Sequence, residues 1–375
     1  MQCGYFDAGV CRSCTHMGEP YGDQVARKQQ EVAAALGPGI TWDLPTVGPE
    51  AGFRNKAKLV VGGSRGEPTL GILDGHLRGV DLTGCGLYEP GLADIVHRLP
   101  TLVADLQLTP YDVASRNGEL KHLLVTHSPD GDAMLRFVLR SPGQLRRIDL
   151  GAIRQHLPEA RVVSVNLQPE HKAVLEGPDE QILTDHDTLP MRVNDVTLHL
   201  RPQSFFQTNT AIAAALYARA RTWVEGLQPA TVLDLYCGVG GFGLHALGHG
   251  AQHVVGVESS SEAVRSAELS ATALAAAGTS EWLAGDATQH LIETTPDLVV
   301  MNPPRRGIGP ELCRRLEDGG PAHLVYSSCN VATLARDLAA MPAYAVTAAG
   351  LFDMFPQTRH HEVMVLLERR GVPRT

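Results

Sequence analysis

The pattern of hydrophobic and polar residues changes near residue 197 and divides the chain into two parts. After this point, apolar runs of strand length alternate with segments of helical periodicity, and the alternation predicts a parallel sheet in an α/β domain. A helix is expected over residues 211–227, capped by Thr208 or Asn209. The strands expected in this domain cover residues 231–236, 253–258, 298–302, 323–327 and 363–367.

The part before residue 197 has a different pattern. From residue 53 to about residue 196, short β-rich runs alternate with turn residues, which predicts an antiparallel α+β domain. The expected strands include residues 58–61, 70–73, 123–125, 134–139 and 162–166. We therefore predict a first domain over residues 1–195 and a second over residues 196–375. A helix near residues 20–36 is able to pack on the second domain.

The composition is that of an ordinary globular enzyme, with 43% hydrophobic and 19% charged residues among 375. No run approaches the roughly 20 apolar residues of a membrane helix. The first residues, Met1-Gln2-Cys3-Gly4-Tyr5, lack the basic and apolar regions of a signal peptide. We expect a cytoplasmic protein, whose cysteines are thiols, catalytic groups or metal ligands rather than disulfides.

The net charge of −9 argues against a protein that coats nucleic acid without specificity. A local basic face remains compatible with this charge, although solvated surface explains the same residues equally well. The basic candidates are the segment 54–58 and Arg136, Arg140, Arg146, Arg147 and Arg154.

Four cysteines in the first part have the spacing of a metal site. Cys3, Cys11 and Cys14 form a C-x7-C-x2-C pattern, and Cys85 lies between two glycines that allow close backbone approach. Four thiolates suit either tetrahedral zinc or an iron–sulfur cluster, and the spacing alone does not choose between them. Because four thiolates complete such a site, we interpret the nearby His16 as structural.

Polar and glycine residues gather where the strands of the second domain end. A glycine-rich turn over residues 238–243 joins a strand to a helix, and Glu258 and Asn302 end later strands. Ligands of open α/β sheets bind at these carboxyl ends. The turn and the acidic residue suit a nicotinamide cofactor or S-adenosylmethionine. The rigid Pro303-Pro304 corner after Asn302 favours a methyltransferase.

Cys329 follows an apolar run and precedes a helix-like segment, so it is expected at a strand end. Most free cysteines are small core hydrophobes. An exposed thiol beside a nucleotide-type site instead suggests covalent catalysis by a thiolate.

The motifs occur together in one order that resembles the RNA uracil-5-methyltransferases, most closely the members that act on 23S ribosomal RNA. The resemblance spans nearly the whole chain. It is carried by Cys3, Cys11, Cys14 and Cys85, Phe53-Arg54-Asn55-Lys56, Pro202-Gln203-Ser204-Phe205-Phe206-Gln207-Thr208-Asn209, Asp234-Leu235-Tyr236-Cys237-Gly238, Asn302-Pro303-Pro304-Arg305-Arg306-Gly307, Ser328-Cys329-Asn330, and His361-Glu362.

The resemblance implies a Rossmann-like class I methyltransferase domain after an α+β, β-rich domain that binds RNA. It also implies S-adenosylmethionine as methyl donor and a [4Fe-4S] cluster on the four cysteines Cys3, Cys11, Cys14 and Cys85. The implied cofactor contacts are Gln207, Tyr236, Glu258 and Asn302. Cys329 would be the nucleophile and Glu362 the base. Many relatives have Asp at the position of Asn302, and some have an RNA-binding β-barrel ahead of the cluster.

The chemistry explains these residue types. Carbon 5 of uracil is a poor nucleophile until a thiolate adds to carbon 6, and a base must then remove the proton from carbon 5 before the thiolate can leave. Base pairing and stacking hide carbon 6, so the uridine should be single-stranded or flipped out of the RNA. We expect a monomer that binds 23S ribosomal RNA and no membrane. Without the resemblance, Glu362 would be interpreted as an exposed strand-end carboxylate.

Several alternatives remain at this stage. Another RNA base methyltransferase, acting on tRNA uracil carbon 5 or on a nitrogen, would share most of the motifs. An N-methyltransferase would place an aromatic residue after the prolines, where Arg305 stands, and a cytosine-5 enzyme would place a cysteine where Pro304 stands. A nicotinamide oxidoreductase with an iron–sulfur centre leaves Cys329 and Glu362 unexplained. An iron–sulfur RNA-binding module without activity is a fourth alternative.

Overall fold

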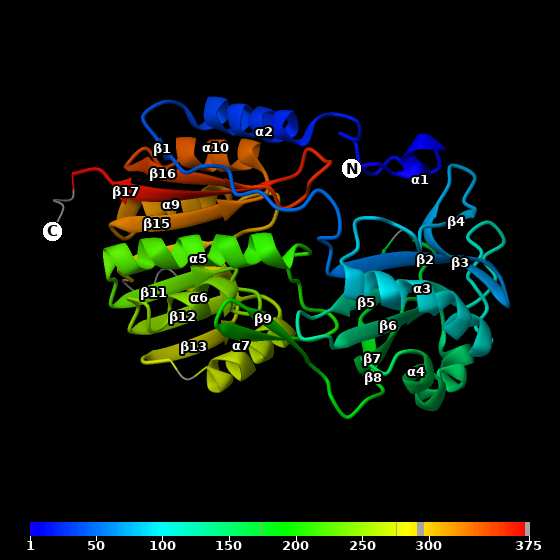
Figure 1. The fold of residues 1–375 in the computed structure, drawn as a ribbon. Coiled ribbons are helices and arrows are strands. Elements are labelled where there is room, and N and C mark those ends of the chain that lie inside the picture. Colours follow the sequence, from blue (N-terminus) through cyan, green and yellow to red (C-terminus); the bar gives the residue numbers. More distant parts are fainter. Residues whose placement is uncertain (173, 275, 291–295, 372–375) are drawn as a thin grey trace. The chain divides into compact units, whose positions relative to one another are not determined.

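The computed structural model describes residues 1–172, 174–274, 276–290 and 296–371 (Figure 1). The chain divides into two compact units. The first comprises Met1–Met17 and Glu50–Met191, and the second comprises Gly18–Pro49 and Arg192–Thr375. The early helix α2 (Tyr21–Leu36) and strand β1 (Thr41–Trp42) therefore belong to the second unit.

The first unit is built on a seven-stranded sheet with the order β4-β3-β2-β5-β6-β7-β8. Its strands are β2 (Lys56–Ser64), β3 (Glu67–Leu73), β4 (Gly79–Asp81), β5 (Leu120–His127), β6 (Ala133–Leu139), β7 (Ala160–Leu167) and β8 (Asp179–Ile182). Its helices are α1 (Gly4–Asp7), α3 (Pro90–Asp105), the 3-10 helix η1 (Pro142–Arg147) and α4 (Leu150–His156). Each strand predicted for this part from the sequence is confirmed.

The prediction of a fully antiparallel sheet is wrong at one pair, because β6 and β7 are parallel. Parallel neighbours need a crossover, whereas antiparallel neighbours can be joined by a tight turn. Here the segment between the two strands holds η1 and α4. It returns the chain to the end of the sheet at which β6 begins, and β7 starts there.

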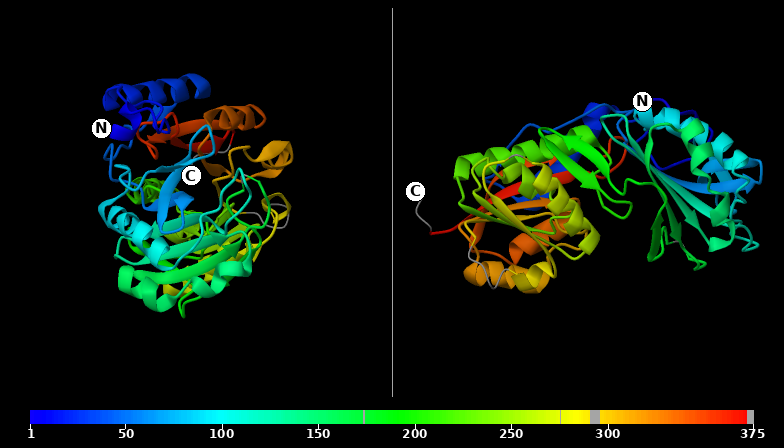
Figure 2. Two further views of the ribbon diagram at one scale, coloured as in Figure 1. Left: turned by 90° about the vertical axis from the view of Figure 1, so that its right-hand side faces the viewer. Right: turned by 90° about the horizontal axis from the view of Figure 1, so that it is seen from below.

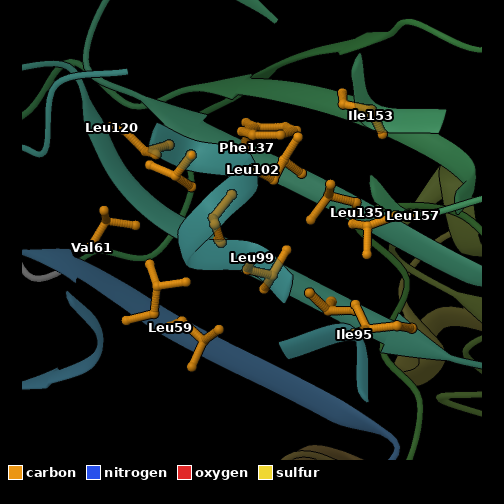
Figure 3. Packing of buried hydrophobic residues seen from close by; sticks show 14 of the residues in the cluster. Leu59, Val61, Ile95, Leu99, Leu102, Leu120, Leu135, Phe137, Ile153 and Leu157 are labelled. Atoms are coloured by element: carbon orange, nitrogen blue, oxygen red, sulfur yellow. The ribbon is translucent and has the colours of Figure 1, made fainter. Parts of the chain in front are cut away.

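The core of the first unit lies between the sheet and helix α3 (Figure 3). Alternate residues of a strand point to one face of a sheet, and Leu135 and Phe137 of β6 obey this rule in the buried cluster. Helix α3 contributes Ile95, Leu99 and Leu102, whose spacing is that of one helical face. Burial of each such side chain contributes about 2 kcal/mol.

The second unit is built on an eight-stranded sheet with the order β1-β16-β17-β15-β14-β11-β12-β13. Its further strands are β11 (Thr231–Leu235), β12 (His253–Glu258), β13 (Thr279–Ala284), β14 (Leu298–Met301), β15 (His323–Ser328), β16 (Tyr344–Phe352) and β17 (Glu362–Arg369). A small sheet of β9 (Leu189–Val193) and β10 (Val196–Leu200) lies where the chain passes from one unit to the other in sequence.

Helices cover both faces of the large sheet (Figures 1 and 2). Helices α2, α9 (Gly309–Gly319) and α10 (Val331–Ala339) pack on one face, where Val32, Leu312 and Leu334 join the buried cluster. The opposite face carries α5 (Thr210–Leu227), α6 (Gly241–Ala246) and α7 (Ser261–Ala273). A short helix, α8 (Ala287–His290), follows β13. Asn209 caps α5, because its Oδ1 accepts a hydrogen bond from the Ile212 amide.

One strand of the large sheet contradicts the predicted parallel arrangement. β17 is antiparallel to both β15 and β16, whereas β1–β16, β14–β15, β11–β14, β11–β12 and β12–β13 are parallel. The reason is that β16 and β17 are joined by the loop 353–361, which contains no crossover helix. Glu362 is the first residue of β17 and therefore lies at the end of the sheet where β15 finishes.

Within the described ranges, no helix is both long enough and apolar enough to cross a membrane.

Candidate active site

A cavity of about 1110 Å³ in the second unit lies at the carboxyl ends of the parallel strands. Ligands of open α/β sheets bind at this edge. All six side chains predicted from the sequence for catalysis and cofactor binding line it: Gln207, Tyr236, Glu258, Asn302, Cys329 and Glu362. The structure thus brings together residues from six separate segments. Their individual roles stay predictions.

The glycine-rich turn forms one wall of the cavity. β11 ends at Leu235, one residue earlier than predicted, and Tyr236 has a positive φ of 61°. Positive φ is unfavourable for a bulky residue, and such strain gathers at functional sites. Gly238 has φ 55°, and a Cβ placed on it would meet no atom of the described residues within 4 Å. The backbone at Gly238 is therefore open to a ligand that approaches closely.

Glu258 links the ends of two neighbouring strands. Its Oε2 accepts a hydrogen bond of 3.3 Å from the Gly238 amide in the turn after β11. Its Oε1 accepts hydrogen bonds from the Ser259 hydroxyl (2.8 Å) and the Ser260 amide (2.9 Å). The Glu258 carboxylate is half-buried. A carboxylate at this position can bind ribose hydroxyls.

A second carboxylate below the turn, Asp234, is not among the residues that line the cavity. It is 1% exposed, and its Oδ2 accepts a hydrogen bond of 2.8 Å from the Gly243 amide. Burial raises the pKa of Asp234 to about 7. Asp234 therefore fixes the start of α6, and the structure gives it no access to a ligand in the cavity.

The Asn302-Pro303-Pro304-Arg305 corner follows β14, and a residue that the sequence did not indicate fixes the segment directly after it, Gly307-Ile308. Asp337 of α10 is 2% exposed, and its Oδ2 accepts hydrogen bonds from the Ile308 amide (2.9 Å) and the Tyr326 hydroxyl (2.8 Å). A Cβ on Gly307 would come within 2.2 Å of this oxygen, so the position requires glycine. A charged residue on the apolar face of α10 is the signal that could have identified Asp337.

Cys329 directly follows β15 and is half-buried. Burial raises the pKa of its thiol, and the nearby Glu362 adds to the rise. A hydrogen bond with Arg305 and the positive charge of that guanidinium oppose the rise in pKa. The Arg305 NH2 group also lies 2.8 Å from His360 Nδ1. Arg305 thus connects the thiol with the loop that precedes β17.

Glu362 is buried rather than exposed, with 2% of its surface accessible. The antiparallel register pairs Ser328 with Val363, which places Glu362 beside the residue that follows β15, Cys329. The Ser327 hydroxyl donates a hydrogen bond of 2.7 Å to Glu362 Oε1. Burial raises the pKa of Glu362 to about 7, and the Ser327 hydrogen bond opposes this only in part.

The segment before α5 brings the aromatic pair Phe205-Phe206 and the neighbouring Gln207 to the cavity. Gln207 is 6% exposed, whereas Phe205 is 72% exposed, and both line the cavity. An aromatic side chain that is both exposed and at a cavity is able to contact a bound ligand. Phe205 is not among the functional residues expected from the sequence. The signal available was an aromatic doublet, Phe205-Phe206, within a polar stretch.

The four clustered thiols lie in the first unit. The pKa of Cys14 is raised to about 11, mainly by burial and further by Cys85, Cys11 and Cys3. The four sulfur groups are therefore close enough to influence one another. Across the part of the chain that the structure describes, no group of three or more His, Cys, Asp or Glu side chains has the arrangement of a metal-ion site.

Two of the predicted basic candidates do not offer free charge to RNA. Arg136 is 2% exposed and makes ion pairs with Glu176 and Glu180, including Nε contacts of 2.8 and 2.9 Å to Glu180. Arg140 pairs with Glu119 at 2.8 Å. Sequence cannot separate paired arginines from free ones, because both occur in β-rich segments with alternating polarity.

Comparison with known proteins decides the family. The chain is 46% identical over 381 residues to the 23S rRNA (uracil(747)-C(5))-methyltransferase RlmC of Halothiobacillus neapolitanus, covering 98% of this chain and 100% of the relative. It is also 46% identical over 377 residues to the RlmC protein of Yersinia pseudotuberculosis, covering 99% and 100%. The chain belongs to the RlmC family of RNA uracil-C5-methyltransferases. This is the subfamily expected from the order of the sequence motifs.

Family models and a solved structure agree with this assignment. Residues 287–370 match the tRNA (Uracil-5-)-methyltransferase family, and residues 205–324 match the methyltransferase small domain. The crystal structure of Pyrococcus abyssi tRNA (uracil-54, C5)-methyltransferase in complex with S-adenosyl-L-homocysteine superposes with a TM-score of 0.77 at 24% identity, covering 94% of this chain and 85% of that one. The likeness supports the predicted class I methyltransferase fold.

Proposed function

We propose that this enzyme transfers a methyl group from S-adenosylmethionine to carbon 5 of a uridine in 23S ribosomal RNA. The observation that carries the proposal is one cavity that holds the Cys329 thiol, the buried Glu362 carboxylate and the glycine-rich turn. Identity of 46% to RlmC enzymes along their whole length supports 23S ribosomal RNA as the substrate. The unit of Gly18–Pro49 and Arg192–Thr375 would form the methyltransferase domain, and the unit of Met1–Met17 and Glu50–Met191 the RNA-binding and cluster domain.

The cavity residues fit S-adenosylmethionine. Gly238 leaves room for close approach of the cofactor, and Glu258 offers a carboxylate for the ribose hydroxyls. Tyr236 would cover the adenosine, while Gln207 and Asn302 would bind the methionine part. When bound, the cofactor supplies an electrophilic methyl group on a sulfonium.

The reaction begins at Cys329. Its thiolate donates an electron pair to carbon 6 of uracil, and the ring electrons shift toward the carbonyl oxygen at carbon 4 to give an enolate. The enolate makes carbon 5 nucleophilic, so that carbon 5 would bond to the methyl carbon as the bond from that carbon to the sulfonium sulfur breaks, leaving the thioether S-adenosylhomocysteine. Arg305 favours the thiolate form of Cys329 through its hydrogen bond and positive charge.

Glu362 completes the reaction. Its carboxylate removes the proton from carbon 5, the carbon 5–carbon 6 double bond forms again, and the carbon 6–sulfur bond breaks to release the Cys329 thiolate. A base is most effective when its pKa is near the working pH, and burial raises the pKa of Glu362 to about 7. The Ser327 hydroxyl orients this carboxylate.

Access to carbon 6 requires a uridine outside the RNA stack. Phe205, exposed at the cavity, offers a surface on which a flipped base can stack, and such stacking contributes about 1–3 kcal/mol per base. Arg306 lines the cavity and is exposed, so it can bind a flanking phosphate.

A [4Fe-4S] cluster on Cys3, Cys11, Cys14 and Cys85 is part of the proposal. The four cysteines lie in one unit, and four thiolates are a donor set that suits iron–sulfur chemistry. Cys14 packs against Phe53 and Leu87, so a cluster held there would brace this part of the first unit. No step of the methyl transfer depends on the cluster.

The test uses transcripts of 23S ribosomal RNA, with tRNA transcripts as competing substrates, and S-adenosylmethionine labelled in its methyl group. The label should enter 5-methyluridine in the 23S transcript. Cys329→Ala should give neither product nor a protein–RNA adduct, whereas Glu362→Gln should accumulate an adduct that survives denaturing electrophoresis. Preferential labelling of tRNA would reassign the substrate, and full activity of Cys329→Ala would contradict the mechanism.

A further inference from the structure

A buried ammonium group lies between helix α2 and the loop that precedes the proposed base. Lys28 of α2 is 1% exposed, and its Nζ donates hydrogen bonds to Asp353 Oδ1 (2.6 Å), the Phe355 carbonyl (3.4 Å) and the His360 carbonyl (3.3 Å). Asp353 itself is fully buried. The three donors of one ammonium thus meet three acceptors, at both ends of the loop 353–361.

Two further side chains of the same helix face contact this loop. The Tyr21 hydroxyl donates to Asp353 Oδ2 at 2.7 Å. Gln24 makes a double contact with Gln357: its Oε1 accepts from the Gln357 amide at 3.1 Å, and its Nε2 donates to Gln357 Oε1 at 3.1 Å. Residues 21, 24 and 28 share one helix face, because they are separated by three and four positions. Helix α2 therefore holds the loop at its start, middle and end.

The loop leads directly into the active site. Phe355 and His360 line the cavity, and Glu362 begins β17 two residues after His360. His360 Nδ1 lies 2.8 Å from the Arg305 guanidinium, whose influence lowers the pKa of the Cys329 thiol. A shift of the His360 backbone would therefore move both the base and the group that favours the thiolate.

Stability alone gives a weak reason for this buried pair. Burial lowers the pKa of Lys28 even though Asp353 raises it, so desolvation outweighs the attraction between the two charges. Buried ion pairs often contribute no more than apolar residues of the same volume. What an apolar residue cannot supply is the pair of hydrogen bonds to the carbonyls of Phe355 and His360.

We propose that Lys28 is a positioning residue for the catalytic base, which holds the loop 353–361 so that Glu362 faces the uracil adduct on Cys329. The inference rests on the proposed function. It assigns Lys28 to the elimination step, because only this step needs the carboxylate near carbon 5. The proposed ribose contact Glu258 accepts its hydrogen bonds from Gly238, Ser259 and Ser260 rather than from this loop, so binding of S-adenosylmethionine should not depend on Lys28.

The experiment compares Lys28→Met with the double variant Lys28→Met/Asp353→Asn in the full-length protein. The double variant leaves no unpaired charge at positions 28 and 353, so it separates loop positioning from a loss of folding. Single-turnover reactions with a 23S transcript measure the ratio of adduct to released product per active enzyme, which a smaller folded fraction does not change. Calorimetry measures the affinity for S-adenosylmethionine. Arg219→Met is the control. Arg219 pairs at 2.7 and 2.8 Å with Asp43, which lies in Gly18–Pro49 like Lys28, and neither Arg219 nor Asp43 lines the cavity.

Both Lys28 variants should release product about 10–100-fold more slowly, as expected for a misplaced catalytic group, and should accumulate the adduct. The affinity of both Lys28 variants for the cofactor should match that of the wild type. Arg219→Met should neither release product more slowly nor accumulate the adduct. Release at the wild-type rate in the double variant would overturn the proposal, as would slower release without adduct. Because Glu362→Gln is run in parallel, absence of an adduct in that variant too would point to failure of the proposed function rather than of the role of Lys28.

Discussion

Replacing Glu362 by glutamine should stabilise the folded protein at pH 8 while it removes the proposed base. Glu362 is 2% exposed, and burial raises its pKa from 4.5 to about 7. A group whose pKa is higher in the folded state favours folding in its protonated form, so stability is greatest below pH 4.5 and falls as the pH rises to about 7. Glutamine is neutral at every pH and retains an oxygen that can accept from Ser327.

The size of the effect follows from the difference between the two pKa values. At about 1.4 kcal/mol per pH unit, ionisation of Glu362 should cost the folded state about 3 kcal/mol at pH 8 and less than about 1 kcal/mol at pH 5. Urea unfolding of wild type and Glu362→Gln at both pH values measures the free energy of unfolding. The variant should be the more stable protein, with the larger difference at pH 8. An equal difference at the two pH values, or a less stable variant at pH 8, would refute the raised pKa.

Two other predictions concern the cofactor sites. Glu258→Ala should weaken binding of S-adenosylmethionine by about 1.5–3 kcal/mol in calorimetry, which is the range for hydrogen bonds to a charged group. Glu281 is exposed on the same sheet, and Glu281→Ala should leave the affinity unchanged. Equal affinities in both variants would exclude the contact. Anaerobically purified protein should be brown and contain about four irons per chain, and Cys85→Ser should lose most of this iron; stoichiometric zinc without iron would contradict the cluster assignment.

Most strands could be predicted because each is a short apolar run bounded by turn residues. The run 298–302 is an example, and β14 covers Leu298–Met301. The strand β16 was missed, since Ala348, Ala349 and Gly350 have little strand propensity and gain their conformation from pairing with β17. Pairing partners far away in sequence cannot be inferred from a local pattern.

The direction of β17 could not be predicted either. Residues 363–367 are uniformly apolar, and a buried strand has this pattern whichever way it runs. The direction decides the chemistry, because it places Glu362 beside Cys329 and out of solvent. Sequence motifs indicated that Glu362 is functional, but its burial and raised pKa follow only from the structure.

Buried polar networks were the largest gap. Lys28 and Asp353 are 325 positions apart, and Asp337 lies on a helix whose pattern is otherwise that of a surface helix. A charged residue is normally exposed, so sequence analysis assigns these three to the surface. The glycine turn and Cys329 were found because their residue types are unusual where strands end. Lys28 and Asp353 have no such signal, and for Asp337 the signal is only a charged residue on the apolar face of α10.

The proposed mechanism depends most on a covalent bond between Cys329 and carbon 6 of uracil. RNA that contains 5-fluorouridine at the target position should trap the wild-type enzyme after methyl transfer, because carbon 5 then has no proton for Glu362 to remove. Mass spectrometry of the digested complex locates the modified cysteine. We predict a methylated nucleotide on Cys329 and none on Cys237 or Cys313, the other two cysteines that line the cavity. An adduct on either of these, or a trapped complex formed by Cys329→Ala, would contradict the mechanism.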